Sequence, residues 1–154
     1  TISVADDPRG LAATETDVWV ASYAAGTITR LDAAANQMVA EIPVGGNPVS
    51  VVITDGAVWV ADTATDTVIQ IDPATNAEVG RIPVGVDPTA LATIGTDVYV
   101  STAGDDTVAR IDTTIGEVVE TFDTGDAPGG VAVTETDLWV TNTEDDTVWR
   151  IGLG

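Results

Sequence analysis

The sequence predicts an all-β protein, a β-propeller whose blades are four-stranded antiparallel sheets. First, the stretch 137–151 recurs as 17–31, 57–71 and 97–111, each copy forty residues after the last without insertion or deletion. Second, every copy carries β-branched and aromatic runs, and no segment has helical periodicity longer than one turn. Third, four short strands in each forty-residue unit are typical of a propeller blade, whereas a β-solenoid has a shorter period.

The chain therefore reads as one domain, 1–154, made of four repeats. We expect them at about 5–44, 45–84, 85–124 and 125–154, preceded by a short strand at 1–4. Thr1–Val4 aligns with the fourth strand of the later units, and the last unit lacks that strand. We expect the N-terminal strand to complete the last blade and close the ring, because closure removes exposed sheet edges.

Each unit opens with a turn around a proline and continues into a first strand. Proline fixes φ where a missing N–H is tolerated, just before a strand. The prolines are Pro8, Pro48, Pro88 and Pro128, and the small apolar strands after them are 11–13, 51–53, 91–93 and 131–133.

The second strand of each unit has no polar alternation, which indicates a strand buried on both faces. A turn rich in Gly, Asp and Thr leads to the third strand, and a turn that begins at an aspartate leads to the fourth. The second strands are 18–21, 58–61, 98–101 and 138–141; the third are 27–31, 67–71, 107–111 and 147–151; the fourth are 38–44, 78–84 and 118–124.

The charge balance is strongly acidic, with 25 acidic residues, five basic ones and a net charge of −20. Such a surface repels phosphate backbones and anionic lipids, so we expect no nucleic-acid and no membrane partner. The absence of cysteine excludes disulfides, thiolate nucleophiles and cysteine-type zinc sites. It leaves the compartment undecided, and the location that we expect is extracellular or periplasmic. We expect no cofactor.

Catalysis is hard to assemble, because the chain has no histidine, cysteine or lysine. A Ser-His-Asp arrangement is excluded, and paired carboxylates are the remaining acids and bases. The candidates lie in the turn between the second and third strands, where aspartate is ordinary turn chemistry, so we predict no catalytic residue. These candidates are Asp105 with Asp106, Asp145 with Asp146, Glu144 and Asp66. The alternative function is a carboxylate-based hydrolase or lyase acting at the mouth of the channel.

The same acidic turns suggest a cation site, since Ca²⁺ prefers oxygen ligands. Glu144, Asp145 and Asp146 supply enough carboxylates for one ion. They lack the alternating spacing that wraps a calcium ion, and the first unit has Ala25 and Gly26 in the corresponding places. A metal site repeated in every blade is therefore not expected, and a single one remains a hypothesis.

The mouth of the central channel is the second candidate site. Asp7, Asn47 and Asp87 occupy equivalent positions before the first strands, Ala127 interrupts the set, and Asp126 lies one residue earlier. A ring of oxygen ligands there could bind a cation or order water. The alternative is that Asn-Pro and Asp-Pro simply make good turns.

Two motifs resemble known propeller repeats. Leu138–Val148 and the linker Ile82–Pro88 resemble the YVTN repeat family and, more distantly, NHL repeats. This resemblance implies a propeller and leaves the activity open, because those families are diverse. The tryptophan strands and Thr27–Leu31 are also similar to streptogramin lyases, which implies catalytic histidine and glutamate; this chain has no histidine, so that activity is not carried over.

We therefore expect a non-catalytic scaffold or a module that binds a protein or a small ligand. The identical spacing also fits an excised or engineered propeller fragment that self-assembles. Four units could close as a four-bladed monomer, or two chains could exchange Thr1–Val4 and form an eight-bladed homodimer. Small residues favour the dimer, because they let adjacent sheets lie nearly parallel; they are Ala12, Ala13, Ala90, Ala92, Gly130 and Ala132.

Overall fold

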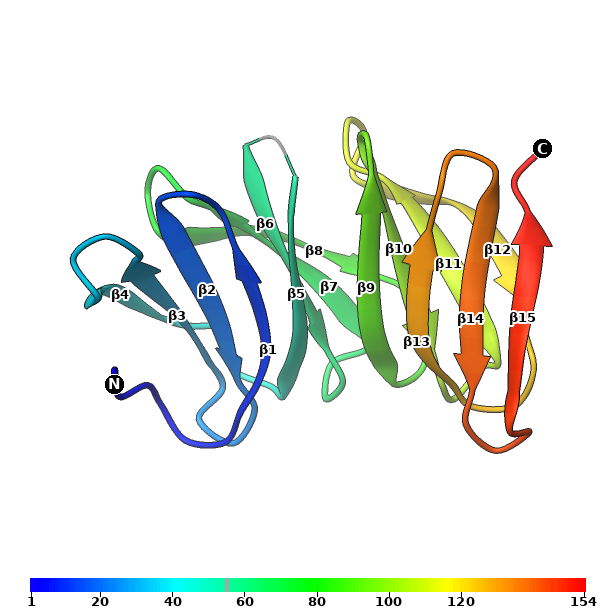
Figure 1. The fold of residues 1–154 in the computed structure, drawn as a ribbon, viewed down its shortest axis with the longest axis horizontal. Coiled ribbons are helices and arrows are strands. Elements are labelled where there is room, and N and C mark those ends of the chain that lie inside the picture. The colour runs from blue at the N-terminus through cyan, green and yellow to red at the C-terminus, as the bar shows by residue number, and fades with distance from the viewer. Residues whose placement is uncertain (55) are drawn as a thin grey trace.

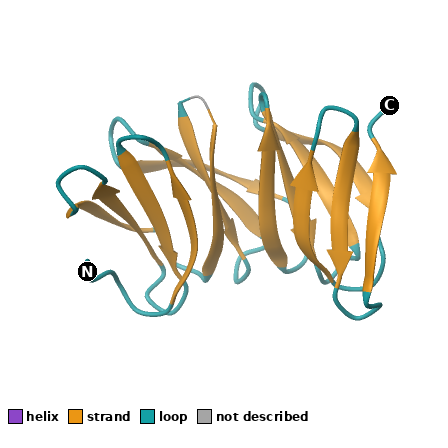
Figure 2. Ribbon diagram, in the orientation of Figure 1, coloured by secondary structure: helices purple, strands orange, loops and turns teal. Residues whose placement is uncertain are grey.

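The computed structural model describes residues 1–54 and 56–154, and the regular structure in this part of the chain consists of strands alone (Figure 2). Within those residues no helix is long and apolar enough to cross a membrane. The strands are β1 (Pro8–Ala13), β2 (Asp17–Ser22), β3 (Thr27–Asp32), β4 (Gln37–Pro43), β5 (Pro48–Thr54), β6 (Ala57–Asp62), β7 (Thr67–Asp72), β8 (Ala77–Pro83), β9 (Pro88–Ile94), β10 (Asp97–Thr102), β11 (Thr107–Asp112), β12 (Glu117–Asp123), β13 (Pro128–Val133), β14 (Asp137–Asn142) and β15 (Thr147–Gly152).

The strands form four antiparallel sheets, one for each sequence unit, as the forty-residue period predicts. Their orders are β1-β2-β3-β4, β5-β6-β7-β8, β9-β10-β11-β12 and β13-β14-β15. The sheets stand side by side in chain order (Figure 1). Strand β5 contacts both β1 and β9, and β9 contacts β13, so the first strand of each sheet lies nearest its neighbours. This is the blade arrangement of a β-propeller.

Each sheet begins at its proline, three residues before the apolar run that marks the first strand in the sequence. Pro8 pairs with Ser22, and the register shifts before Leu11 pairs with Val20. The same shift follows the proline in the other three sheets. Proline is accepted at the first residue of a strand, and a bulge after it absorbs the mismatch.

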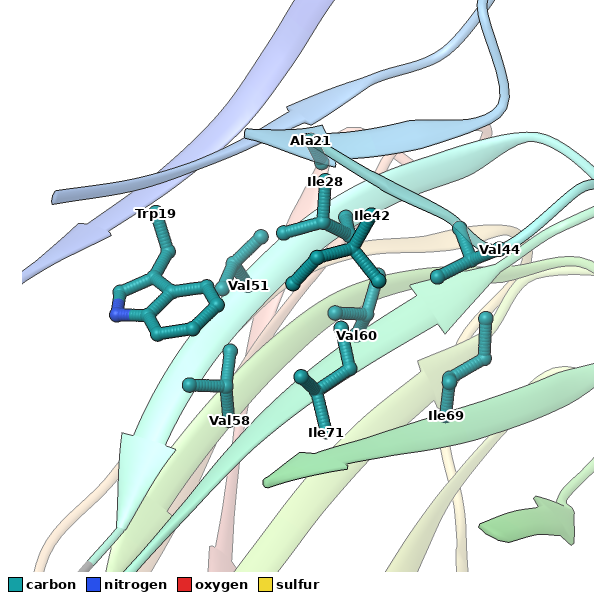
Figure 3. Packing of buried hydrophobic residues seen from close by; sticks show 10 residues of the cluster. All are labelled: Trp19, Ala21, Ile28, Ile42, Val44, Val51, Val58, Val60, Ile69 and Ile71. Carbon is teal, nitrogen blue, oxygen red and sulfur yellow. The ribbon is translucent and has the colours of Figure 1, made fainter. Parts of the chain in front are cut away.

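The core lies between sheets. Figure 3 shows the junction of the first two sheets, where Trp19, Ile28 and Ile42 of the first face Val58 and Ile71 of the second. Strand β6 is buried along its whole length, which confirms that the second strands of the repeats can be buried on both faces. Two further clusters fill the next two junctions.

The two ends of the row differ from its middle. Residues 1–4 form no strand, and the last sheet has three strands. The N-terminal segment leads away from β1 on the side opposite β5, and β15 lies at the other end of the row (Figure 1). In the single chain the segment 1–4 therefore does not supply the fourth strand of the last sheet, contrary to the expectation from the sequence. Closure of the ring through a second copy stays a prediction.

Candidate functional site

The linkers between sheets carry the residues that we expected at the channel mouth. Asp7 and Asp87 have φ of 54° and 56°, and Ala127 has 51°. Aspartate and asparagine enter this left-handed conformation more readily than most residues. In the linker that holds Asn47, the preceding Gly46 takes the left-handed conformation, with φ of 60°. The Asp-Pro sequences are therefore turn formers first, as the alternative interpretation stated.

The linker residues make one backbone contact in common. The carbonyl of each accepts a hydrogen bond from the turn between the second and third strands of the following sheet, at 2.8–3.2 Å. Their side chains act locally: the Asp7 carboxylate lies 2.9 Å from the Arg9 guanidinium, and the Asn47 amide donates to the carbonyl oxygen of Tyr23 at 3.2 Å. The structure thus places Asp7, Asn47, Asp87 and Ala127 in equivalent turns, with Asp126 one residue before the last of them. Ligand binding by this set stays a prediction.

In the second and third sheets, one aspartate ties the sheet to the linker that follows it. The Asp66 carboxylate accepts a hydrogen bond from the backbone N–H of Asp87 at 2.9 Å. The Asp106 carboxylate accepts one from the backbone N–H of Ala127, also at 2.9 Å. In both cases the carboxylate belongs to one sheet and the N–H to the linker that leads into the next. We call this contact the linker clasp.

A second pair of aspartates holds the same linkers from the other side. Asp105 accepts from the backbone N–H of Val86 at 2.7 Å, and Asp145 accepts from that of Asp126 at 2.8 Å. Each of these linkers therefore lies between carboxylates of both neighbouring sheets. Three of the paired aspartates that raised the possibility of acid and base chemistry, Asp105, Asp106 and Asp145, thus act as structural hydrogen-bond acceptors.

The proposed cation ligands are not gathered into a cluster. In the part of the chain that the structure describes, no group of three or more acidic side chains is arranged to hold a metal ion. Asp145 already accepts the Asp126 N–H, and Asp126, a channel-mouth candidate, contributes that backbone donor. The site at Glu144, Asp145 and Asp146 therefore stays a prediction without support from the geometry.

Arginine–aspartate pairs recur on the outer part of three sheets. Arg30 Nε lies 2.7 Å from Asp17, and Arg150 Nε lies 2.7 Å from Asp137. The hydrogen bond from arginine holds the pKa of Asp17 and of Asp137 below the ordinary aspartate value. The equivalent pair in the third sheet joins Arg110 to an aspartate at 3.0 Å. Asp17 and Asp137 are therefore stabilised as anions and are poor candidates for a general acid.

Among the carboxylates that the structure describes, that of Asp62 is completely buried. Asp62 is 0% exposed, and its Oδ1 accepts the backbone N–H groups of Asn47 at 2.7 Å and Ala64 at 3.1 Å. Its Oδ2 accepts the Thr65 hydroxyl at 2.8 Å and the Arg81 guanidinium at 3.2 Å. The sequence shows no sign of this site except that serine, threonine or asparagine occupies the equivalent position elsewhere. Its four donors saturate the carboxylate, so its role is to join the first two sheets.

An open groove of about 740 Å³ lies among the turns of the first three sheets. Its lining includes Thr14, Thr54 and Thr93, and the carboxylate in it is Asp17, which Arg30 already pairs. Its described lining residues therefore offer hydroxyl and apolar contacts and one carboxylate that is already paired.

The last sheet exposes an apolar surface that the sequence does not reveal. We call it the end face: Ala132, Trp139, Thr141 and Val148, all exposed. Trp139 is 42% exposed, whereas the equivalent Trp19, Trp59 and Tyr99 are 1–2% exposed. Val148 is 62% exposed, and its three equivalents are completely buried. Trp139 and Val148 also line a shallow hollow of about 270 Å³ with little polar surface. The expectation that every second strand is buried on both faces was wrong for Trp139.

No family model matches the chain, and no curated protein matches it. Solved β-propeller structures do match. The computationally designed Ika4 protein has 19% identity and a TM-score of 0.85, covering 100% of this chain and 96% of that one. A streptogramin B lyase has 18% identity and a TM-score of 0.82, covering 97% of this chain and 53% of that one.

BamB from Moraxella catarrhalis has 18% identity and a TM-score of 0.75, with 94% of this chain and 42% of that one covered. The chain thus spans about half the length of the lyase and of BamB. At these identities the likeness shows the propeller fold alone, which the four sheets share.

Proposed function

We propose that the chain is a non-catalytic β-propeller scaffold that assembles with a second copy into an eight-bladed ring. The end face carries this proposal. Its side chains are those that every other sheet buries against its successor, and here Trp139 and Val148 are exposed. Burying apolar surface contributes roughly 25 cal/mol per Å², so an open tryptophan and valine favour a partner.

The first sheet presents the matching surface. We call it the starting face: Leu11, Val18, Val20 and Leu31. Their equivalents in the second sheet, Val51, Val58, Val60 and Ile71, pack against the first sheet in the core cluster of Figure 3. Leu11 is 67% exposed, whereas Val51 is 5% exposed. Val18 is half-buried, and Val20 and Leu31 are 8% and 7% exposed in the single chain, so Leu11 is the open part of the starting face. A second copy therefore brings to the end face the same kind of surface that covers the first sheet within the chain.

The non-catalytic part of the proposal is supported by the carboxylates themselves. Asp66, Asp105, Asp106 and Asp145 each accept a backbone hydrogen bond from a linker, which is a structural role. Designed proteins are among the structures that the chain resembles, so the fold can exist as a scaffold without a reaction. We also propose that the repeats are of the YVTN type, on the motif at Leu138–Val148.

The surface for a protein or small-ligand partner would be the channel mouth. Asp7, Asn47, Asp87 and Asp126 lie in equivalent linkers there, and a ring of two copies would present each of them twice. A net charge of −20 per chain favours a cationic partner for this surface.

Light scattering coupled to size exclusion tests the assembly. We expect a mass twice the 15.7 kDa of one chain. Trp139→Ser should shift the chain towards the single-chain mass, because it places a polar group in the centre of the contact. Val79→Ser is the matched control, since Val79 is 57% exposed on the second sheet, which has neighbours on both sides. A wild-type chain with the mass of one copy would refute the proposal.

A further inference from the structure

We propose that the second copy is held in register at each junction by two contacts. Its Thr1–Val4 segment adds the fourth strand beside β15, and the backbone N–H of its Asp7 forms a linker clasp with Asp146. The proposal rests on the two-copy ring above and names the residues that join it. Both contacts follow from interactions that the chain already makes at its three internal junctions.

The register of the added strand follows from the three complete sheets. In each complete sheet, the first two residues of the third strand pair with the last two residues of the fourth strand. The observed pairs are Thr27↔Pro43, Thr67↔Pro83, Thr107↔Asp123, then Ile28↔Ile42, Val68↔Ile82 and Val108↔Phe122. Transferred by forty residues, these place Ser3 of the second copy opposite Thr147 and its Ile2 opposite Val148.

This register covers the exposed part of the end face. Ile42 and Ile82, the equivalents of Ile2, are 5% and 9% exposed and belong to the clusters between sheets. Ile2 itself is half-buried in the single chain. Placed beside Val148, which is 62% exposed, it would complete the same apolar layer.

The backbone beyond that strand is fixed in the same way at every internal junction. The N–H groups of Val44, Val84 and Thr124 each donate to the carbonyl of the residue just before the third strand of the same sheet. The distances are 3.0, 3.1 and 2.9 Å. Those acceptors are Gly26, Asp66 and Asp106. By the same spacing, the N–H of Val4 in the second copy meets the carbonyl of Asp146.

Asp146 is prepared for the clasp. It has φ of 56°, and Asp66 and Asp106 both have 55°, so the three carboxylates leave the turn from the same backbone conformation. Asp66 and Asp106 each accept a linker N–H at 2.9 Å. The Asp146 side chain accepts no hydrogen bond from any residue that the structure describes. The N–H donors of the two observed clasps are Asp87 and Ala127, in the linkers that follow the second and third sheets. The linker that would follow the fourth sheet belongs to a second copy, and the equivalent residue there is Asp7.

The first unit offers the Asp7 N–H the adjacent Asp6 carboxylate and no equivalent of Asp62. The N–H of Asn47 obtains one from Asp62 at 2.7 Å, although Gly26 stands where a clasp carboxylate would be. At the equivalent of Asp62 the first unit has Ser22, and at the equivalent of Asp105 it has Ala25. In the single chain the Asp7 N–H reaches the adjacent Asp6 carboxylate at 3.1 Å. Asp146 of the other copy is therefore the carboxylate that the repeat assigns to it.

Asp146→Gly tests the clasp. Glycine removes the carboxylate and keeps the left-handed backbone, as Gly26 does with φ of 63°. An exposed hydrogen bond of this kind changes an equilibrium about threefold, so the two junctions of a symmetric ring should raise the dimer dissociation constant about tenfold. Asp106→Gly is the control: its clasp lies within one chain, so it should lower the melting temperature and leave the dissociation constant unchanged.

The outcomes separate the clasp from the ring. A dimer whose dissociation constant is the same for wild type and Asp146→Gly overturns the clasp and leaves the ring standing. A wild-type chain that sediments as one copy overturns both. If Asp106→Gly weakens the dimer as much as Asp146→Gly does, the effect comes from the turn in general and the clasp is wrong.

A disulfide tests the strand register, because the chain has no cysteine of its own. Residues directly opposite in an antiparallel pair lie within disulfide reach. Mixing Ser3→Cys with Thr147→Cys under oxidation should give a cross-linked pair of chains, and Thr1→Cys with Thr147→Cys, two residues out of register, should give far less. Equal cross-linking by both mixtures, or none by the first, would refute this register.

Discussion

The buried pair of Asp62 and Arg81 offers a test of how the first two sheets are joined. In Asp62→Asn the amide oxygen can keep the two backbone N–H groups that Oδ1 accepts. The amide nitrogen then faces the Thr65 hydroxyl and the Arg81 guanidinium, both of which donate to Oδ2. The hydroxyl can rotate and become an acceptor, but the guanidinium has no acceptor to offer.

The expected cost is therefore that of one hydrogen bond between charged groups, about 1.5–3 kcal/mol. The lower end applies, because Arg81 is 29% exposed on its side chain and also binds Glu78 at 2.8 Å. We expect about 1.5 kcal/mol for Asp62→Asn, which lowers the melting temperature by about 3–6 °C in a chain of this size. Arg81→Met should cost a similar amount, and the two changes together should cost little more than either.

Urea unfolding of the wild type, both single variants and the double variant measures the coupling, which we expect near 1.5 kcal/mol. All four are compared at one protein concentration, because assembly would make stability depend on it. The control is the cycle of Asp137→Asn and Arg150→Met: Arg150 is 62% exposed on its side chain, so we expect a coupling clearly weaker than that of Asp62 and Arg81. Equal coupling in both cycles would show that burial of Asp62 does not strengthen its ion pair.

Three further predictions concern the whole molecule. The melting temperature should rise from low to molar sodium chloride, because counterions screen a net charge of −20; a flat or falling curve would contradict this. Hydrogen bonds from Ala74 and from Thr114 hold the pKa of Asp72 and of Asp112, respectively, below 3.8. Their contribution to stability is present above about pH 3.8 and is lost as pH falls through the lowered values, so acid unfolding curves should be less steep in Asp72→Asn/Asp112→Asn. Trp59→Ala should lower the free energy of unfolding by about 3–5 kcal/mol, and Trp139→Ala should cost clearly less in dilute protein, where the end face is open.

The sequence was sufficient for the strands, because each repeat states the same pattern independently. Four copies of an apolar second strand agree on their phase, and a misreading in one unit would have been visible against the others. The limits of the strands also agreed to within one residue, except at the first strands, which begin at the prolines, and at residues 1–4, which form no strand. There the bulge lets a residue without an N–H enter the sheet, and a pattern of apolar residues does not report a bulge.

The hydrogen bonds between repeats could not be predicted from the repeat pattern. Asp66 and Asp106 look like turn residues in the sequence, and they are, but their carboxylates also bind a backbone N–H twenty-one residues away. Asp62 likewise bonds to the neighbouring linker. A carboxylate in a turn has the same local pattern whether it points to solvent or to the next linker, so only the relative placement of the sheets separates these cases.

The end face and the starting face are different surfaces, so the contact that joins two copies is heterologous. Such a contact does not by itself fix the number of chains in the assembly, because each added chain again exposes one surface of each kind. The tilt between neighbouring sheets decides whether the chains meet after two copies, meet after three, or miss one another and continue as a helical filament. Substitutions that alter this tilt, such as enlarging the small residues Ala12 or Ala92 between sheets, would therefore change stoichiometry before they changed the fold.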